Sequence, residues 1–191
     1  MGGGGALGAA DWAPSELMNH ILAALTPENA LALRVSLKTG LRIDDVLSLR
    51  AADIAKGKRF TISEKKTHKH RRIYLSESLL DELRSISGRY YVFEGRLNET
   101  EHRTRQAVNK DLARAAEAFR VPASVQISPH SARKIYAVDV FNKYGDVKKV
   151  QELLNHSRES VTLLYCLAEA VYMKKTQKRP KKGQKRPVSR R

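Results

Sequence analysis

SPHSARKIYAVDVFNKYG, residues 128–145, is the stretch on which the fold and the chemistry of this chain depend. The Ser-Pro pair that opens it is typical of a helix start, and the closing Gly145 is typical of a helix end. His130 and Arg133 are three residues apart, so they share one helix face with Cβ atoms roughly 5–6 Å apart. Both lie in the first turn, where free N–H groups and the helix dipole favour an anion. The stretch therefore predicts a phosphate site, although such a pair is also common on an ordinary protein surface.

The rest of the chain predicts mainly helix with one small antiparallel sheet, an α+β fold class. Thr26 followed by Pro27 predicts a capped helix start, and Gly40 predicts the end of that helix. Further helices are predicted at residues 15–25, 43–49, 76–86, 104–119, 146–155 and from 157 onward. Paired strands are predicted at 59–63 and 71–75, joined by the basic turn EKKTHKH, with another short strand at 90–93. We expect residues 15–173 to form one domain.

The composition points to a polyanionic partner. The 191 residues carry 36 Lys+Arg against 20 Asp+Glu, a net charge of +16. Such an excess favours nucleic acid or an anionic membrane surface. The single cysteine, Cys166, excludes an intrachain disulfide framework and a multi-cysteine zinc site, and it is predicted to be a small buried hydrophobe. No apolar run approaches the ~18–20 residues of a membrane span, and no signal-peptide pattern opens the chain.

The two ends of the chain differ in composition from the body. Residues 1–14 include a run of glycines and are interpreted as a flexible leader or an expression scar. Residues 174–191 hold ten basic and no acidic residues, which leaves about +6 for everything before them. This segment is predicted to be disordered when free and to lie along DNA phosphates as an arm. A solubilising tail and a localisation signal remain the alternatives.

Several further residues could act on the same phosphate. Arg42 opens a predicted helix in which Asp45 could orient its guanidinium, and an ordinary capping ion pair is the alternative. Lys66 lies in the basic turn between the strands, which could equally be a solvated hairpin. His156 precedes the last predicted helix, and Tyr165 lies in its leucine-rich stripe, where tyrosines are usually part of the core. Because free tyrosine has a pKa of about 10, it becomes a useful nucleophile only where cations stabilise the developing charge.

Taken together, these residues carry a resemblance to a known family. In chain order they are Arg42, Lys66, His130, Arg133, His156 and Tyr165. This order resembles the active-site signature of the tyrosine recombinase family, also called the phage integrase family. The local contexts are similar too, because TGLR at 39–42, KTHK at 66–69, HSAR at 130–133 and LLNHS at 153–157 resemble the family's motifs. The resemblance covers roughly residues 26–171.

The chain also departs from the family's pattern. Asn155 stands in place of a common glycine, and Lys134 stands where many members have a second histidine. Lys65 is adjacent to Lys66, and we take Lys66 as the candidate because counting back from Arg71 gives the family's turn length. Members usually carry a separate N-terminal core-binding domain, whereas few residues precede the catalytic region here. The chain is therefore interpreted as a catalytic-domain fragment or a minimal member, and the glycine leader favours the fragment.

The resemblance implies a tyrosine recombinase catalytic-domain fold and site-specific DNA strand exchange through a 3′-phosphotyrosine intermediate. Arg42 and Arg133 would hold the non-bridging oxygens of the scissile phosphate, Tyr165 would attack phosphorus, and Lys66 would protonate the departing 5′-oxygen. The two histidines of the signature would donate hydrogen bonds to the phosphate or assist the tyrosine proton. The family's reaction implies neither a metal nor another cofactor.

The implied partners are double-stranded DNA, further copies of the chain in a tetramer on DNA, and accessory DNA-bending proteins. The implied setting is cytoplasmic, in a prokaryote, a phage or another mobile element, and residues 167–173 would pack on the body of the same or a neighbouring protomer. The basic residues predicted to contact DNA are Lys65, Lys69, Arg71, Lys134, Lys174, Lys175, Lys178 and Arg179. Two alternatives remain open, namely DNA relaxation of the type IB topoisomerase kind and a DNA-binding relative without catalysis.

Overall fold

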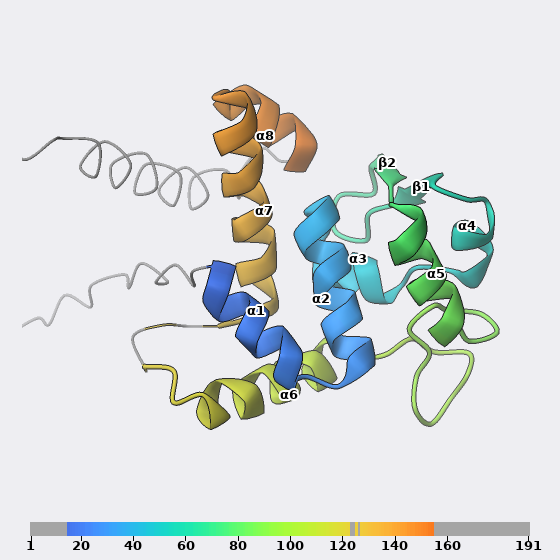
Figure 1. Cartoon of the computed structure of the whole chain (residues 1–191). Coiled ribbons are helices and arrows are strands. Elements are labelled where there is room, and N and C mark those ends of the chain that lie inside the picture. The colour runs from blue at the N-terminus through green and yellow to red at the C-terminus, as the bar shows by residue number, and fades with distance from the viewer. Residues whose placement is uncertain (1–14, 123–124, 126, 155–191) are drawn as a thin grey trace, which may run out of the picture.

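The structure, a computed structural model, describes residues 15–122, 125 and 127–154 (Figure 1). In chain order the elements are α1 (Ser15–Ala24), α2 (Pro27–Thr39), α3 (Ile43–Leu47), α4 (Ala51–Ala55), β1 (Arg59–Ser63), β2 (His70–Tyr74), α5 (Glu77–Ile86), α6 (Arg105–Ala118), α7 (Pro129–Tyr144) and α8 (Val147–Leu154). The predicted class, mainly helix with a small antiparallel sheet, is confirmed. Within the described range, no helix is both long and apolar enough to span a bilayer.

Helix α7 packs against α2, and the two lie side by side in Figure 1. Helix α2 ends at Gly40, whose φ of 67° lies in the left-handed region and whose N–H donates to the Ser36 carbonyl at 2.7 Å. A Cβ on Gly40 would lie 2.3 Å from the ring of Tyr136 on α7. Glycine is therefore required here twice, for the backbone conformation and for the close approach of α7.

The two helix-ending glycines allow these requirements to be separated. Gly145 ends α7 at a φ of 68°, nearly that of Gly40, but a Cβ there would meet nothing within 4 Å. We expect Gly145→Ala to lower the free energy of unfolding by about 1 kcal/mol through backbone strain alone. Gly40→Ala should cost a further 1–3 kcal/mol or so, because the Tyr136 ring must move. Urea unfolding of both variants checks this, and equal losses would contradict it.

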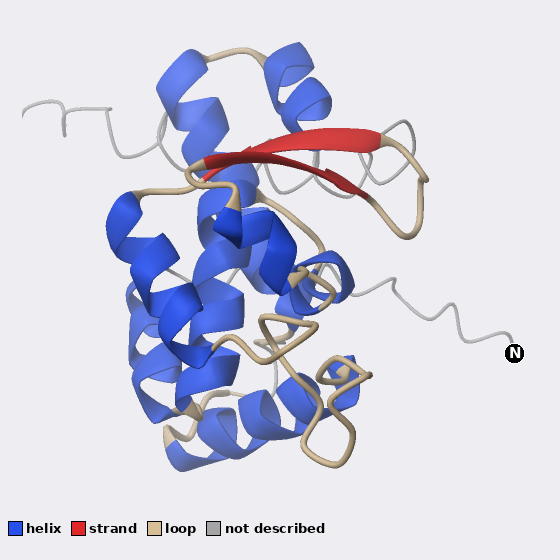
Figure 2. Cartoon of the chain, turned by 90° about the vertical axis from the view of Figure 1, so that its right-hand side faces the viewer, coloured by secondary structure: helices blue, strands red, loops and turns tan. Residues whose placement is uncertain are grey.

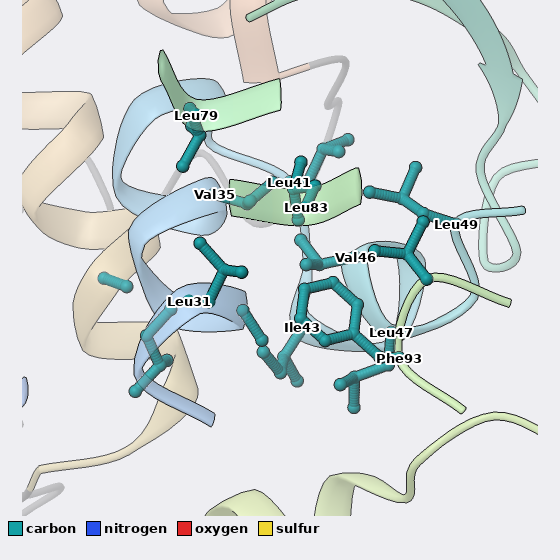
Figure 3. Packing of buried hydrophobic residues seen from close by; sticks show 14 of the residues in the cluster. Leu31, Val35, Leu41, Ile43, Val46, Leu47, Leu49, Leu79, Leu83 and Phe93 are labelled. Carbon is teal, nitrogen blue, oxygen red and sulfur yellow. The ribbon is translucent and has the colours of Figure 1, made fainter. Parts of the chain in front are cut away.

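The main hydrophobic core lies between α2, α3 and α5 and is closed by the loop that carries Phe93. In Figure 3, Val35 of α2 points toward Leu83 of α5, and Phe93 lies beside Leu47 of α3. Each of these side chains is fully or almost fully buried, which contributes roughly 1.5–3 kcal/mol per residue. A second, smaller cluster joins α7 to α8. The core thus fixes the ends of α2, α3 and α7 relative to one another.

The strands β1 and β2 form an antiparallel hairpin, shown in red in Figure 2. Arg59 pairs with Tyr74, and Ser63 pairs with His70. Alternate residues of β1 face inward, so that Phe60 and Ile62 are buried while their neighbours are exposed. The second strand begins and ends one residue earlier than predicted, and Leu75 still donates its N–H to the Lys58 carbonyl at 3.0 Å.

The predicted extent of one helix and the existence of one strand were wrong. The helix predicted at 43–49 ends at Leu47, and an unpredicted helix, α4, follows from Ala51. The strand predicted at 90–93 is only an isolated bridge between Tyr91 and Arg50. Its partner, Arg50, is also the N-cap of α4. A strand pair cannot grow beyond one bridge when one side turns at once into helix.

Thr26 precedes α2 as predicted, but its hydroxyl does not cap the helix. The hydroxyl donates to Asp111 of α6 at 3.0 Å, and the Thr26 N–H donates to the same carboxylate at 2.8 Å. The Asn29 amide and the Arg114 guanidinium also donate to Asp111. Burial alone would raise the pKa of Asp111, but these hydrogen bonds lower it to about 2 from an ordinary 3.8. The start of α2 is therefore held by a carboxylate of α6.

This carboxylate gives a pH-dependent prediction. A lowered pKa in the folded state means that Asp111 stabilises the fold above pH ~4 and that this stabilisation is lost between about pH 4 and 2. We expect Asp111→Asn to lower the free energy of unfolding at neutral pH by about 2 kcal/mol, with the gap closing over that acid range. Asp81→Asn is the control, because Asp81 is 63% exposed in its pair with Arg84. Urea titrations at several pH values check this, and a pH-independent gap would refute it.

Candidate active site

One pocket collects most of the described residues that the sequence singled out. It has a volume of about 420 Å³ and lies where the starts of α3, α6 and α7 meet the turn between β1 and β2. It is lined by Arg42, Ile43, Asp44, Asp45, Lys65, Lys66, Arg105, Pro129, His130 and Arg133. Of the six signature residues, Arg42, Lys66, His130 and Arg133 are therefore brought together, although they come from distant parts of the chain.

Arg133 is buried, with 3% of its surface exposed. Its Nη1 donates to the Gly40 carbonyl at 2.5 Å, and its Nη2 donates to the Leu154 carbonyl at 2.8 Å. These carbonyls belong to the C-terminal ends of α2 and α8, where helices leave acceptors unsatisfied and carry partial negative charge. One guanidinium therefore joins three helices. Its second acceptor, Leu154, directly precedes Asn155 and His156 in the sequence.

Arg42 is the N-cap residue of α3 and is also buried, at 8% exposure. Its Nη1 lies 3.2 Å from Oε2 of Glu64 and 3.8 Å from Oδ2 of Asp45. The predicted proximity of Asp45 to Arg42 is therefore present, and Glu64 is a closer partner that the sequence reading did not name. Desolvation by burial raises the pKa of Asp45, against the lowering effect of the Lys65 N–H, which donates to its Oδ1 at 2.8 Å.

The two adjacent lysines of the hairpin turn both line the pocket, and Lys65 also contacts a histidine. Lys65 Nζ lies 2.7 Å from Nε2 of His102, whose Nδ1 lies 2.8 Å from the Arg103 carbonyl oxygen. A carbonyl oxygen only accepts, so neutral His102 carries its proton on Nδ1 and its Nε2 accepts from the Lys65 ammonium. Lys65 is thus engaged by the loop that precedes α6. The assignment of Lys66 as the catalytic lysine stays a prediction from the sequence.

The other predicted site residues differ in their exposure, and some lie outside the described residues. His130 is exposed in the first turn of α7 and lines the pocket, and Lys69 is exposed on the turn. Arg71, predicted to contact DNA, has 11% of its side chain exposed and turns inward, toward Glu64 and the Thr39 carbonyl. Lys134 is partly buried on α7. The predicted residues His156, Tyr165, Lys174, Lys175, Lys178 and Arg179, like Cys166, lie outside the described residues.

Three residues of the site were missed by the sequence analysis. Glu64 continues the inward alternation of Phe60 and Ile62 on β1, and this phase could have placed it facing the interior. Arg105 begins α6 and lines the pocket, with Nη1 3.8 Å from Oδ2 of Asp44. His102 holds Lys65 from a loop whose position no local pattern indicates.

The arrangement suits a phosphate group. Two buried guanidinium groups, two lysines and Arg105 surround one pocket, and Pro129 and His130 at the start of α7 also line it. Planar guanidinium groups bind two phosphate oxygens at once, and their attraction is strongest where water is excluded. The described residues contain no group of three His, Cys, Asp or Glu side chains placed to hold a metal ion.

Fold and pocket together define the catalytic-core class of the tyrosine recombinases, and the comparisons agree. The model of the phage integrase family matches residues 14–170. The chain is 29% identical over 136 residues to the probable integrase/recombinase YoeC of Bacillus subtilis, covering 68% of this chain and 71% of that protein. The chain belongs to the phage integrase family.

Solved structures show the same fold. The catalytic core of lambda integrase superposes with a TM-score of 0.65 at 20% identity, covering 77% of this chain and 92% of that one. The XerH recombinase bound to its palindromic difH substrate, a post-cleavage complex, gives a TM-score of 0.65 at 20% identity, covering 88% and 53%. The chain spans about half the length of the curated Xer recombinases that it matches.

The role of Arg133 in joining three helices can be tested by its removal. We expect Arg133→Gln to lower the free energy of unfolding by about 1.5–3 kcal/mol, because hydrogen bonds from a charged donor to two buried carbonyls are lost. Amide exchange should accelerate most in α8, whose last carbonyl loses its donor. Arg34→Gln is the matched control, since Arg34 and Glu82 form a pair that is 41% and 42% exposed, which is worth about 0–1 kcal/mol. Equal effects of the two changes would contradict this role.

Proposed function

We propose that the chain is the catalytic domain of a site-specific DNA recombinase, which cleaves and rejoins DNA strands through a 3′-phosphotyrosine intermediate. The observation that carries the proposal is the convergence of Arg42, Lys66, His130 and Arg133 on one pocket. Membership of the phage integrase family supports the same reaction. So does the family's motif order, which continues in the sequence to His156 and Tyr165.

In the cleavage step, Arg42 and Arg133 bind the non-bridging oxygens of the scissile phosphate. The Tyr165 oxygen attacks phosphorus in line, a bond forms between them, and the bond from phosphorus to the 5′-oxygen breaks. Lys66 transfers a proton to that departing oxygen, and His130 and His156 donate hydrogen bonds to the phosphate or assist the tyrosine proton. Negative charge grows on the phosphate oxygens in the transition state, and fixed cations stabilise it most strongly there.

Rejoining reverses these bond changes. A 5′-hydroxyl, from the same or from a partner strand, attacks the phosphotyrosine and releases the tyrosine. The energy of the phosphodiester is conserved in the covalent intermediate, so the exchange requires neither ATP nor another cofactor. Strand exchange differs from simple relaxation only in which 5′-hydroxyl attacks.

The partner that we propose is double-stranded DNA. His130 is exposed and lines the pocket, Lys69 is exposed on the hairpin turn, and the basic residues 174–191 would add contacts to phosphates that are independent of sequence. We further propose that four chains assemble on two DNA sites, with accessory DNA-bending proteins, in a prokaryotic or phage setting. The structure of XerH with its difH substrate is consistent with DNA as the substrate of this fold.

The test is covalent trapping on nicked duplexes whose sequence is randomised on both sides of the nick. After cleavage, the short strand between the cut and the nick dissociates and carries away the 5′-hydroxyl that rejoining requires. A DNA adduct that resists denaturing detergent should therefore accumulate. It should vanish in Tyr165→Phe, fall by at least about 100-fold in Lys66→Ala, and fall much less in Lys65→Ala. Loss of the adduct in Lys65→Ala but not in Lys66→Ala would reverse the assignment of the lysines.

Two other outcomes would replace the proposal. DNA binding without any adduct would indicate a non-catalytic DNA-binding relative. An adduct that relaxes supercoiled DNA but never joins strands from two duplexes would indicate relaxation of the topoisomerase kind.

A further inference from the structure

Glu64 is the most deeply buried acidic residue among those that the structure describes, with 0% of its surface exposed. It directly follows β1 and faces inward in phase with Phe60 and Ile62. It does not line the pocket of Arg42 and Arg133. An ionised carboxylate in such a position is costly unless cations and hydrogen-bond donors surround it.

Its donors come from three different parts of the site. Oε2 accepts from Nη1 of Arg42 at 3.2 Å and from the Thr67 hydroxyl at 2.8 Å. Oε1 accepts from Nη1 of Arg71 on β2 at 3.3 Å. The Arg71 guanidinium also donates to the Thr39 carbonyl, at the end of α2. The carboxylate therefore joins the start of α3, the hairpin turn, β2 and, through Arg71, the end of α2.

The backbone of Glu64 also closes the turn that carries Lys66. Its N–H donates to the Lys69 carbonyl at 3.0 Å, and its carbonyl accepts from the His68 N–H at 2.8 Å. The residues on either side of Lys66 are both held by buried carboxylates. Asp45 accepts from the Lys65 N–H at 2.8 Å, and Glu64 accepts from the Thr67 hydroxyl.

We propose that Glu64 is a positioning residue that fixes the Arg42 guanidinium and the Lys66 turn relative to each other for phosphoryl transfer. This inference rests on the proposed function. It explains why one side chain contacts both the cation that would bind the phosphate and the turn that would deliver the proton. Fixed geometry of this kind is required because a shift of about 1 Å between reacting groups can cost about 100-fold in rate.

The negative charge of Glu64 distinguishes a positioning role from a role in phosphate binding. A negative charge beside Arg42 weakens the attraction of that guanidinium for a phosphate, so Glu64 cannot serve to raise DNA affinity. Burial alone would raise the pKa of Glu64, but Thr67, Arg71 and Arg42 hold it below its ordinary value. The carboxylate therefore remains charged at neutral pH. The Glu64 carboxylate therefore weakens the attraction of Arg42 for phosphate while it fixes the orientation of the guanidinium. Removing its charge should affect DNA affinity and the rate of adduct formation differently.

The experiment compares Glu64→Gln with the wild-type chain and with Glu82→Gln. The control removes the carboxylate of Glu82, which pairs with Arg34 and does not line the pocket of Arg42 and Arg133. On randomised nicked duplexes we expect Glu64→Gln to lower the rate of adduct formation by roughly 10- to 100-fold. Its affinity for a fluorescent duplex, measured by anisotropy, should be unchanged or higher. Glu82→Gln should match the wild type in both measurements.

Hydrogen exchange supplies a readout that requires no DNA. The amides of Lys65, His68 and Lys69 should exchange faster in Glu64→Gln and unchanged in Glu82→Gln. If Glu64→Gln does not fold, Thr67→Val takes its place, because it removes only the hydroxyl that donates to Glu64. This variant should slow adduct formation less than Glu64→Gln, again without weakening DNA binding.

The outcomes distinguish the positioning role of Glu64 from the proposed recombinase function. Adduct formation by Glu64→Gln at the wild-type rate would overturn the positioning role, as would a fall in rate that merely follows a matching fall in DNA affinity. Unchanged exchange in the turn would also overturn it. Failure of the wild-type chain to form any adduct would overturn the proposed function, and with it the role of Glu64 in that reaction.

Discussion

Two arginine side chains, Arg42 and Arg133, are buried at one pocket, and the rest of the structure depends on keeping them charged there. Removing a guanidinium from water is costly unless acceptors replace the lost hydration. Helix ends and carboxylates supply these acceptors: the last carbonyls of α2 and α8 for Arg133, and Glu64 and Asp45 for Arg42. The positions of five elements are thereby coupled to two side chains.

This coupling explains features that are remote from the pocket. The Gly40 carbonyl reaches Arg133 because Gly40 ends α2 in a left-handed conformation and leaves room for the Tyr136 ring. The start of α2 is held in turn by Asp111 of α6, the helix whose first residue, Arg105, lines the pocket. The hairpin is attached through Glu64 and Arg71. Each of these elements therefore presents a cation to the pocket or supports a neighbour that does.

Much of this architecture could be predicted from the sequence, because its signals are local. Ser128-Pro129 and Gly145 bound α7, Ser76 caps α5, and the alternation of Phe60 and Ile62 indicates β1. The order of the signature residues predicted which cations would meet. What local signals could not show is where chain segments remote in sequence would cross. The engagement of Lys65 by His102 and the inward turn of Arg71 depend on such crossings, as does the reduction of residues 90–93 to a single bridge.

The central claim is that these cations are arranged around a phosphate, and a titration with inorganic phosphate followed by NMR tests it most directly. At constant ionic strength, the account predicts that shift changes concentrate at Arg42, Lys66, His130 and Arg133 and that Arg42→Gln abolishes them. The chain contains its own comparison, a second basic pocket of about 560 Å³ lined in part by Arg96, Lys110 and Arg114. Changes that concentrate there, or that persist unaltered in a folded Arg42→Gln, would contradict the account.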